Sequence, residues 1–210
     1  MRLVQIQTIK FTHPLYKELD NLCFLSKNLY NATLYTVRQH YFQTQKYLNY
    51  NNVNKLFTDT QQPDYCSLPR KVSKFTQQLV DKNFKSFFSL LQKKKSNSYD
   101  KPINIPKYLH PVKGRQVVHY TKQALSFKEK GYVKLSGTDI KIKIPDVDVD
   151  FVRIVPKNMF INIEVGYQQE CLKSVESTNY ASIDLGVNNL ATITSNVFCP
   201  LIINGKPLKS

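Results

Sequence analysis

The sequence predicts an α+β protein in which a helical segment is inserted after the first strand of a small β-barrel. Residues 3–11 alternate apolar and polar side chains, the period of a half-buried strand. Residues 14–47 and 69–92 then carry apolar side chains three or four positions apart, as amphipathic helices do. Beyond about residue 114, short strand-like runs recur at roughly eight- to twelve-residue spacing, which favours a barrel.

In the first strand, Val4, Ile6 and Thr8 alternate with Gln5 and Gln7. This strand cannot be stable alone, so we expect it to pair with strands that follow the helical insertion.

Two long helices are expected in the insertion. The first begins at Pro14, which suits the first helical turn because its missing N–H has no partner there, and it ends near Tyr47. An Asn- and Gln-rich connector over 48–66 has room for a short helix at 53–57. The second long helix runs from Pro69 to Gln92, where a Lys-rich run is expected to break it.

Short strands are expected over the rest of the chain. Within them, Ile140, Ile142 and Ile144 alternate with Lys141 and Lys143. One face of this strand is therefore expected to pack, and the other to present lysines to solvent or to a ligand. The predicted strands are 115–120, 124–127, 132–135, 140–144, 151–155 and 159–167. Residues 181–194 indicate a buried strand, a tight turn at Gly186 and a second strand.

Net charge is +15, from 30 Lys and Arg against 15 Asp and Glu, which points to a polyanionic partner. With 41% hydrophobic residues, the chain is too apolar to be a disordered basic tail. The charge is concentrated in residues 61–130, where fifteen basic and four acidic side chains give +11, whereas residues 131–210 are neutral. We therefore expect a basic folded surface in the middle of the chain.

Lys71, Lys74, Lys82 and Lys85 fall on one broad face of the second helix, which suits the phosphate backbone of a nucleic acid. Taken singly, each of these lysines fits a solubilising role equally well. The candidate nucleic-acid-binding residues are Arg70, Lys71, Lys74, Lys82, Lys85, Lys93, Lys94, Lys95, Lys113, Arg115 and Lys122.

Aromatic side chains lie between these cations and could stack on bases, namely Phe84, Phe87, Phe88, Tyr99, Tyr108 and Tyr120. The helical spacing of the three phenylalanines favours the core, and we do not assign them to stacking.

Composition also excludes several classes of protein. No window approaches eighteen consecutive apolar residues and no signal peptide opens the chain, so we expect a soluble cytoplasmic protein without a membrane partner. Cys23, Cys66, Cys171 and Cys199 are widely spaced, which indicates reduced structural thiols and neither a zinc site nor a disulfide framework.

Asp184 ends a predicted strand and precedes Gly186, where the backbone can turn sharply beside whatever the carboxylate holds. A lone Asp at a strand end is usually a turn residue. Two functional classes also use this arrangement: RNase H-like nucleases, in which the acid binds a divalent metal, and actin-like ATPases and sugar kinases, in which it attends the phosphates.

The segment 184–192, Asp-Leu-Gly-Val-Asn-Asn-Leu-Ala-Thr, closely resembles the first RuvC motif of the TnpB (OrfB) proteins of insertion sequences. These are RNA-guided endonucleases related to type V CRISPR effectors. Further segments resemble the same family in the same order: 28–35, 68–72, 85–88, 118–126 and 203–210.

The resemblance implies a wedge-type β-barrel made of residues 1–12 and 111–176, a helical recognition domain over 13–110, and the start of an RNase H-like (RuvC) nuclease domain over 177–210. It covers about the N-terminal half of a family member. The implied partners are a guide RNA derived from the transposon end and double-stranded target DNA.

For catalysis, the resemblance implies that Asp184 is a catalytic residue and a Mg²⁺ ligand. The family uses two further acids and a four-Cys zinc ribbon, which these residues lack. Because two-metal hydrolysis needs several converging carboxylates, we expect Asp184 alone to bind Mg²⁺ poorly and this chain not to cleave by itself. Alternatives are a stand-alone RNA- or DNA-binding module and, less favoured, a fragment of an actin-like ATPase or sugar kinase.

Overall fold

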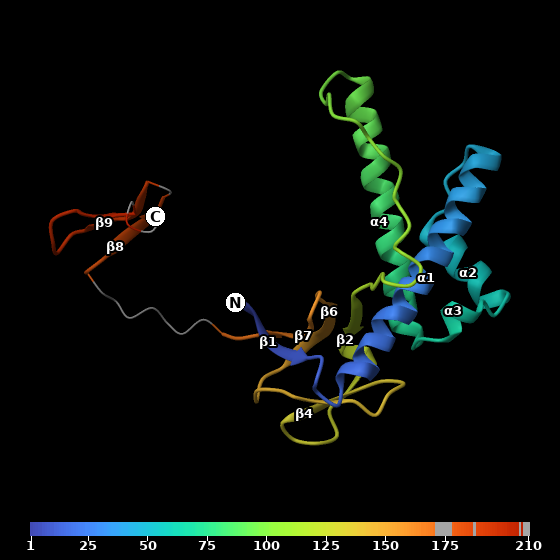
Figure 1. Cartoon of the computed structure of the whole chain (residues 1–210), viewed down its shortest axis with the longest axis horizontal. Coiled ribbons are helices and arrows are strands. Elements are labelled where there is room, and N and C mark those ends of the chain that lie inside the picture. The colour runs from blue at the N-terminus through green and yellow to red at the C-terminus, as the bar shows by residue number, and fades with distance from the viewer. Residues whose placement is uncertain (171–177, 187, 206, 208–210) are drawn as a thin grey trace. The chain divides into compact units, whose positions relative to one another are not determined.

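The computed structural model describes residues 1–170, 178–186, 188–205 and 207, and the chain divides into two compact units, Met1–Gln169 and Glu170–Ser210 (Figure 1). Helices and antiparallel strands both contribute, which confirms the predicted α+β class. The larger unit contains β1 (Arg2–Lys10), α1 (Tyr16–Thr44), α2 (Tyr50–Asp59), α3 (Pro63–Cys66), α4 (Arg70–Lys95), β2 (Val118–Thr121), the 3-10 turn η1 (Lys122–Ala124), β3 (Leu125–Ser126), β4 (Tyr132–Leu135), β5 (Lys141–Lys143), β6 (Val149–Pro156) and β7 (Phe160–Gln168).

The strands of the larger unit form two antiparallel sheets, one with the order β1-β7-β6-β2 and one with the order β3-β4-β5. Strand β1 pairs with β7 along its whole length, so the four helices are inserted between the first strand and its sheet partners, as expected. In the part of the chain that the structure describes, these ladders are two separate sheets and do not close into the single expected barrel.

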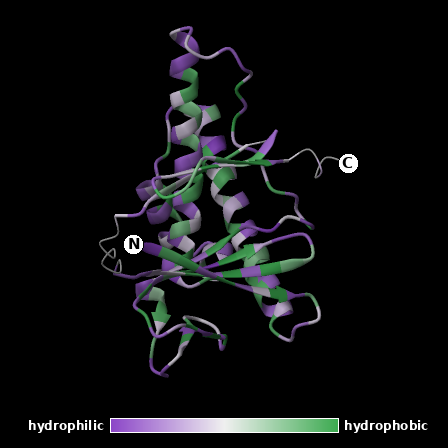
Figure 2. Cartoon of the chain, turned by 90° about the vertical axis from the view of Figure 1, so that its left-hand side faces the viewer, coloured by the Kyte–Doolittle hydropathy of each residue, from purple (hydrophilic) through white to green (hydrophobic). Residues whose placement is uncertain are grey.

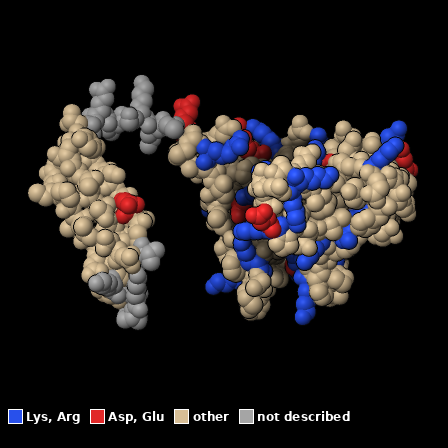
Figure 3. All heavy atoms as spheres, turned by 90° about the horizontal axis from the view of Figure 1, so that it is seen from above, with Lys and Arg blue, Asp and Glu red and all other residues tan. Residues whose placement is uncertain are grey.

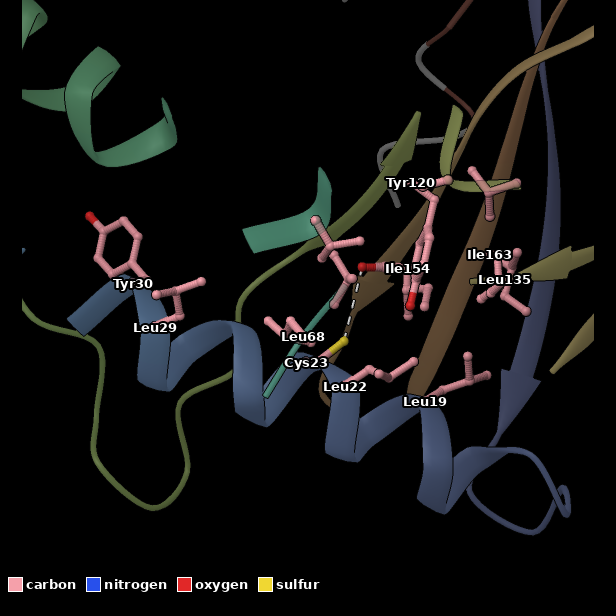
Figure 4. Packing of buried hydrophobic residues seen from close by; sticks show 14 of the residues in the cluster. Leu19, Leu22, Cys23, Leu29, Tyr30, Leu68, Tyr120, Leu135, Ile154 and Ile163 are labelled. Carbon is pink, nitrogen blue, oxygen red and sulfur yellow. Dashed lines mark hydrogen bonds between the residues drawn. The ribbon is translucent and has the colours of Figure 1, made fainter. Parts of the chain in front are cut away.

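Helix α1 forms because its apolar side chains recur three and four positions apart and therefore share one face. On this face Leu19, Leu22 and Cys23 pack against the four-stranded sheet, where Ile154 and Ile163 are fully buried (Figure 4). The Cys23 thiol lies 4.0 Å from the carbonyl oxygen of Ile154. Burial raises the pKa of this thiol to about 12, so it is an unreactive part of the core.

Helices α1 and α4 approach each other through small polar side chains. The hydroxyls of Ser26 and Thr76 lie 3.2 Å apart, and Ser26 also donates to the Val117 carbonyl at 3.1 Å. Helix α4 extends through Lys95, three residues beyond the expected end at Gln92, and it ends within the Lys-rich run that was expected to break it. Lysine is a good helix former, and cations in a last turn interact favourably with the helix dipole.

Strand β1 faces the opposite way from what its alternation suggested. Val4 and Ile6 are exposed, whereas Gln7 is half-buried and its amide donates to the Lys143 carbonyl at 2.5 Å. The cause is the register with β7, which sets Gln7 opposite buried Ile163 on the core face. Figure 2 shows the strands of this sheet mainly in the hydrophobic colour.

The smaller unit is a three-stranded antiparallel sheet, β10-β9-β8, made of β8 (Ala181–Leu185), β9 (Asn189–Ser195) and β10 (Leu201–Asn204). The predicted hairpin is present, whereas β10 was not predicted. Ile183 and Leu185 are 61% and 75% exposed, so the expectation that β8 is buried is wrong for the residues described.

Two of the described cysteines differ from the expected structural thiols. Cys23, Cys66 and Cys199 are free, but only Cys23 is buried, so Cys66 and Cys199 are not structural core thiols; Cys171 lies outside the described residues. Within the described ranges, the helices contain no stretch that is both long and apolar enough to cross a membrane.

An aromatic stack joins α4 to the sheet. The His119 ring lies between Phe75 of α4, with ring centroids 4.0 Å apart, and Phe151 of β6, at 5.3 Å. Phe151 fits because Gly166 opposite it has no side chain: a Cβ there would lie 2.2 Å from the Phe151 ring. Burial, reinforced by the charge of Arg153, lowers the pKa of His119 to about 4.

Because the unfolded chain protonates His119 near its ordinary pKa of 6.5, the folded protein should lose stability as the pH falls from 6.5 to 4. The full shift corresponds to about 3 kcal/mol; solvent screening of the half-buried ring leaves an expected loss of about 1–2 kcal/mol. Urea unfolding at pH 7 and 4.5 measures this, with His119→Phe as the control that removes the titration. Equal pH dependence of the two proteins would contradict the assignment.

Candidate nucleic-acid interface

Lys71, Lys74, Lys82 and Lys85 lie on one side of α4, and we refer to these four residues as the lysine face. At about 100° per residue they fall within roughly 80° of the helix circumference. The opposite side carries the buried residues of α4: Val72, Ser73, Thr76, Gln77, Val80 and Phe84. Core packing of α4 therefore directs the lysine face to solvent, as the sequence predicted.

Asp81 is the acid within α4, and its charge is already engaged. Its carboxylate accepts hydrogen bonds from the Tyr47 hydroxyl at 2.6 Å, the Tyr50 N–H at 2.9 Å and the Lys85 ammonium at 2.7 Å. Burial alone would raise the pKa of Asp81, but these bonds outweigh it and lower the pKa. Lys71, Lys74 and Lys82 keep uncompensated charges in the described structure.

Further predicted cations lie at the ends of α4. Arg70 begins the helix, and Lys93, Lys94 and Lys95 form its exposed last turn. Figure 3 shows Lys and Arg side chains distributed over the larger unit, whereas the described part of the smaller unit shows none. The basic surface is therefore a property of the larger unit in the described chain.

Arg115 is already engaged by an acid in this arrangement, and its role as a nucleic-acid contact stays a prediction. Its Nε and Nη2 atoms donate to the two carboxylate oxygens of Asp20, both at 2.7 Å. Its Nη1 atom also donates to the carbonyls of Val112 and Gly114. The bond to Asp20 raises the pKa of Arg115 further. This guanidinium ties the segment after α4 to α1.

Lys122 is also paired, through a 2.5 Å contact with Asp148, although both side chains are exposed. Such a surface pair is worth little and does not prevent Lys122 from contacting a phosphate. Lys113 is exposed and lines an open pocket of about 490 Å³ together with Lys157, Asp20 and Tyr16. Lys157 was missed by sequence reasoning, because only the fold brings it close to Lys113.

The aromatic candidates divide by burial. Phe84 is fully buried and Phe87 and Phe88 pack against the core, as the helical spacing favoured. Tyr120 is fully buried too and cannot stack on a base. Tyr108, by contrast, is exposed.

Asp184 lies in β8 opposite Thr192 of β9, on the same side of the strand as Ser182. Its side chain is exposed. Among the described residues, no three His, Cys, Asp or Glu side chains converge at one point. A magnesium centre needs several oxygen ligands, so the single exposed carboxylate of Asp184 does not by itself fit one.

Searches of protein-family models and of curated proteins gave no match to this sequence. Among solved structures, the Cas12f1–sgRNA–target DNA complex, determined by cryo-electron microscopy, contains a similar chain. The alignment has a TM-score of 0.37 and 11% identity, and it covers 99% of this chain and 58% of that chain. The present chain thus spans less than two thirds of the matched chain, and similarity at this level carries no argument by itself.

Replacing Arg115 by Lys keeps the charge but loses the two-pronged bond to Asp20, so the free energy of unfolding should fall by about 1 kcal/mol or more. Affinity for RNA should stay within about twofold of wild type. Lys74→Gln is the matched control, expected to weaken RNA binding and leave the urea midpoint unchanged. A variant at Arg115 that loses RNA affinity while keeping its stability would show that Arg115 is a direct contact.

Proposed function

We propose that this chain is the nucleic-acid-binding part of a TnpB-like RNA-guided DNA endonuclease, and that it holds guide RNA and target DNA through α4 and the two sheets of the larger unit. In this proposal these two sheets serve as the wedge domain and the helices as the recognition domain. The hairpin β8–β9 belongs to a RuvC-type nuclease domain in which Asp184 is one of the Mg²⁺-binding acids.

The lysine face is the observation that carries the binding part of the proposal. Three of its ammonium groups are unpaired in the described structure, and they point away from the core of α4. Residues 82–99 contain no acid at all, whereas an ordinary solvated surface mixes both signs. A one-sided row of cations attracts the regularly spaced phosphates of a nucleic acid. The motif resemblance, centred on residues 184–192, supports the specific family.

A stand-alone RNA- or DNA-binding module would use the same lysine face. The two proposals differ in what the bound RNA does. A TnpB-like protein uses its RNA to select DNA by base pairing, so binding of a duplex should depend on a matching guide. A simple module binds RNA and DNA independently of their complementarity.

Changing Lys71, Lys74, Lys82 and Lys85 together to Gln should weaken RNA binding and reduce its salt dependence. Each lost phosphate contact lowers the slope of log K against log salt by about 0.7 for a single strand, so four contacts lower it by roughly 3. Fluorescence anisotropy titrations at salt concentrations from about 50 to about 300 mM measure the affinity and its salt dependence.

The control carries the same charge change at four exposed lysines that lie outside α4 and outside the strands: Lys17, Lys55, Lys128 and Lys130. This variant should keep most of the affinity and most of the slope. Equal losses in the two variants would show that net charge, and not the lysine face, governs binding. Salt-insensitive binding by the wild type would overturn the electrostatic proposal itself.

The chain alone should not cleave single-stranded DNA in the presence of Mg²⁺, because one carboxylate cannot hold the metal ions that hydrolysis needs. Labelled DNA incubated with the wild type and with Asp184→Ala should remain intact in both cases. Cleavage that disappears in Asp184→Ala would contradict this and would show that the missing acids come from a second copy of the chain.

A further inference from the structure

A row of side chains outside the lysine face follows α1 at positions i, i+3 and i+7: exposed Tyr35, partly buried Arg38 and exposed Phe42. Tyr108, from the segment that follows α4, joins them beside Arg38. We call these four residues the aromatic stripe. Tyr35, Phe42 and Tyr108 are 58%, 51% and 43% exposed, so part of each ring is accessible to a ligand.

Arg38 lies over two of the three rings of the aromatic stripe, Phe42 and Tyr108. Its guanidinium carbon lies 4.8 Å from the centroid of the Tyr108 ring and 5.6 Å from that of Phe42. Within the described chain it has no acidic partner. The planar cation is thus held among aromatic faces while its charge stays available.

The position of Tyr108 is fixed by the chain on its C-terminal side. The side-chain amide of Asn31 donates to the Leu109 carbonyl and accepts from the Leu109 N–H, both at 2.9 Å. Buried Lys27 donates to the Pro111 carbonyl at 2.5 Å. These bonds anchor the segment onto α1 from two consecutive turns, so Tyr108 is presented on a fixed backbone.

The charge around the aromatic stripe selects the kind of partner. No Asp or Glu occurs in residues 21–58 or 101–128, the two segments that supply the stripe, whereas Lys101 and Lys107 lie in the second of them. These two segments therefore carry net positive charge, which favours a polyanionic partner over a cationic or a purely apolar one. From Tyr35 to Phe42 the helix rises about 10 Å, the length of about three stacked bases.

We propose that the aromatic stripe stacks on unpaired bases of single-stranded RNA or DNA, with Arg38 contacting both base faces and phosphates. This rests on the proposed nucleic-acid-binding function and adds a site to it. A base within a duplex is already stacked on its neighbours, so the aromatic stripe discriminates single strands from duplexes. The lysine face, which contacts phosphates, does not.

The test compares a single-stranded 12-nucleotide DNA with an abasic strand that has the same number of phosphates. Tyr35→Ala, Phe42→Ala and Tyr108→Ala should each lower affinity for the normal strand by about tenfold and leave affinity for the abasic strand unchanged. Tyr35→Phe and Tyr108→Phe keep the rings and should bind as the wild type does. Phe127→Ala removes a comparably exposed ring elsewhere and should have no effect.

The outcomes separate the two proposals. A wild-type chain that binds neither strand, nor a single-stranded RNA of the same length, would overturn the nucleic-acid-binding function and the aromatic stripe with it. Wild-type binding of both strands, with the alanine variants unchanged, would overturn the aromatic stripe alone. Equal losses on the normal and abasic strands would also overturn it, because the rings would then act on the fold. Thermal unfolding of each variant identifies that case independently.

Discussion

The fold of the larger unit depends on one helix having to pack against two different layers. Helix α1 buries Leu19, Leu22 and Cys23 against the four-stranded sheet, and further along it buries Leu34 and Val37 among the helices. A helix 29 residues long spans about 43 Å, enough to connect both layers with one continuous buried face. Every outward-facing feature of α1 and α4 is set by this packing, because the side that is not buried faces solvent.

The sequence was most informative where structure follows from local periodicity. The 3.6-residue period of α1 and α4 was sufficient to predict both helices and the lysine face, since all of these depend on neighbours three or four positions apart. Strand β1 shows the opposite case. Its alternation of Val4 and Ile6 with Gln5 and Gln7 predicted a strand correctly, but a two-residue period does not say which face is covered. Pairing with β7 decided that, and the core covers the side of Gln7 and Ile9, although Gln5 on the same side is exposed.

Long-range pairing also explains what was missed at the candidate interface. Arg115 was an ordinary basic residue in the sequence, and its partner Asp20 is 95 residues away. Tyr108 and Arg38 come together only because Asn31 anchors the segment after α4 onto α1. The absence of acids from residues 21–58 and 101–128 was visible in the sequence and was the signal that could have identified these two segments together.

The two proposed contact surfaces recognise different parts of the same ligand. Lysines on α4 contact phosphates, so their contribution weakens with salt and is the same for every sequence. Ring stacking on α1 is insensitive to salt and accepts any unpaired base. Neither surface reads base edges, which is what sequence-specific recognition by a protein requires. In the proposed function, base pairing by a bound guide RNA would supply the sequence selectivity without any protein contact to base edges.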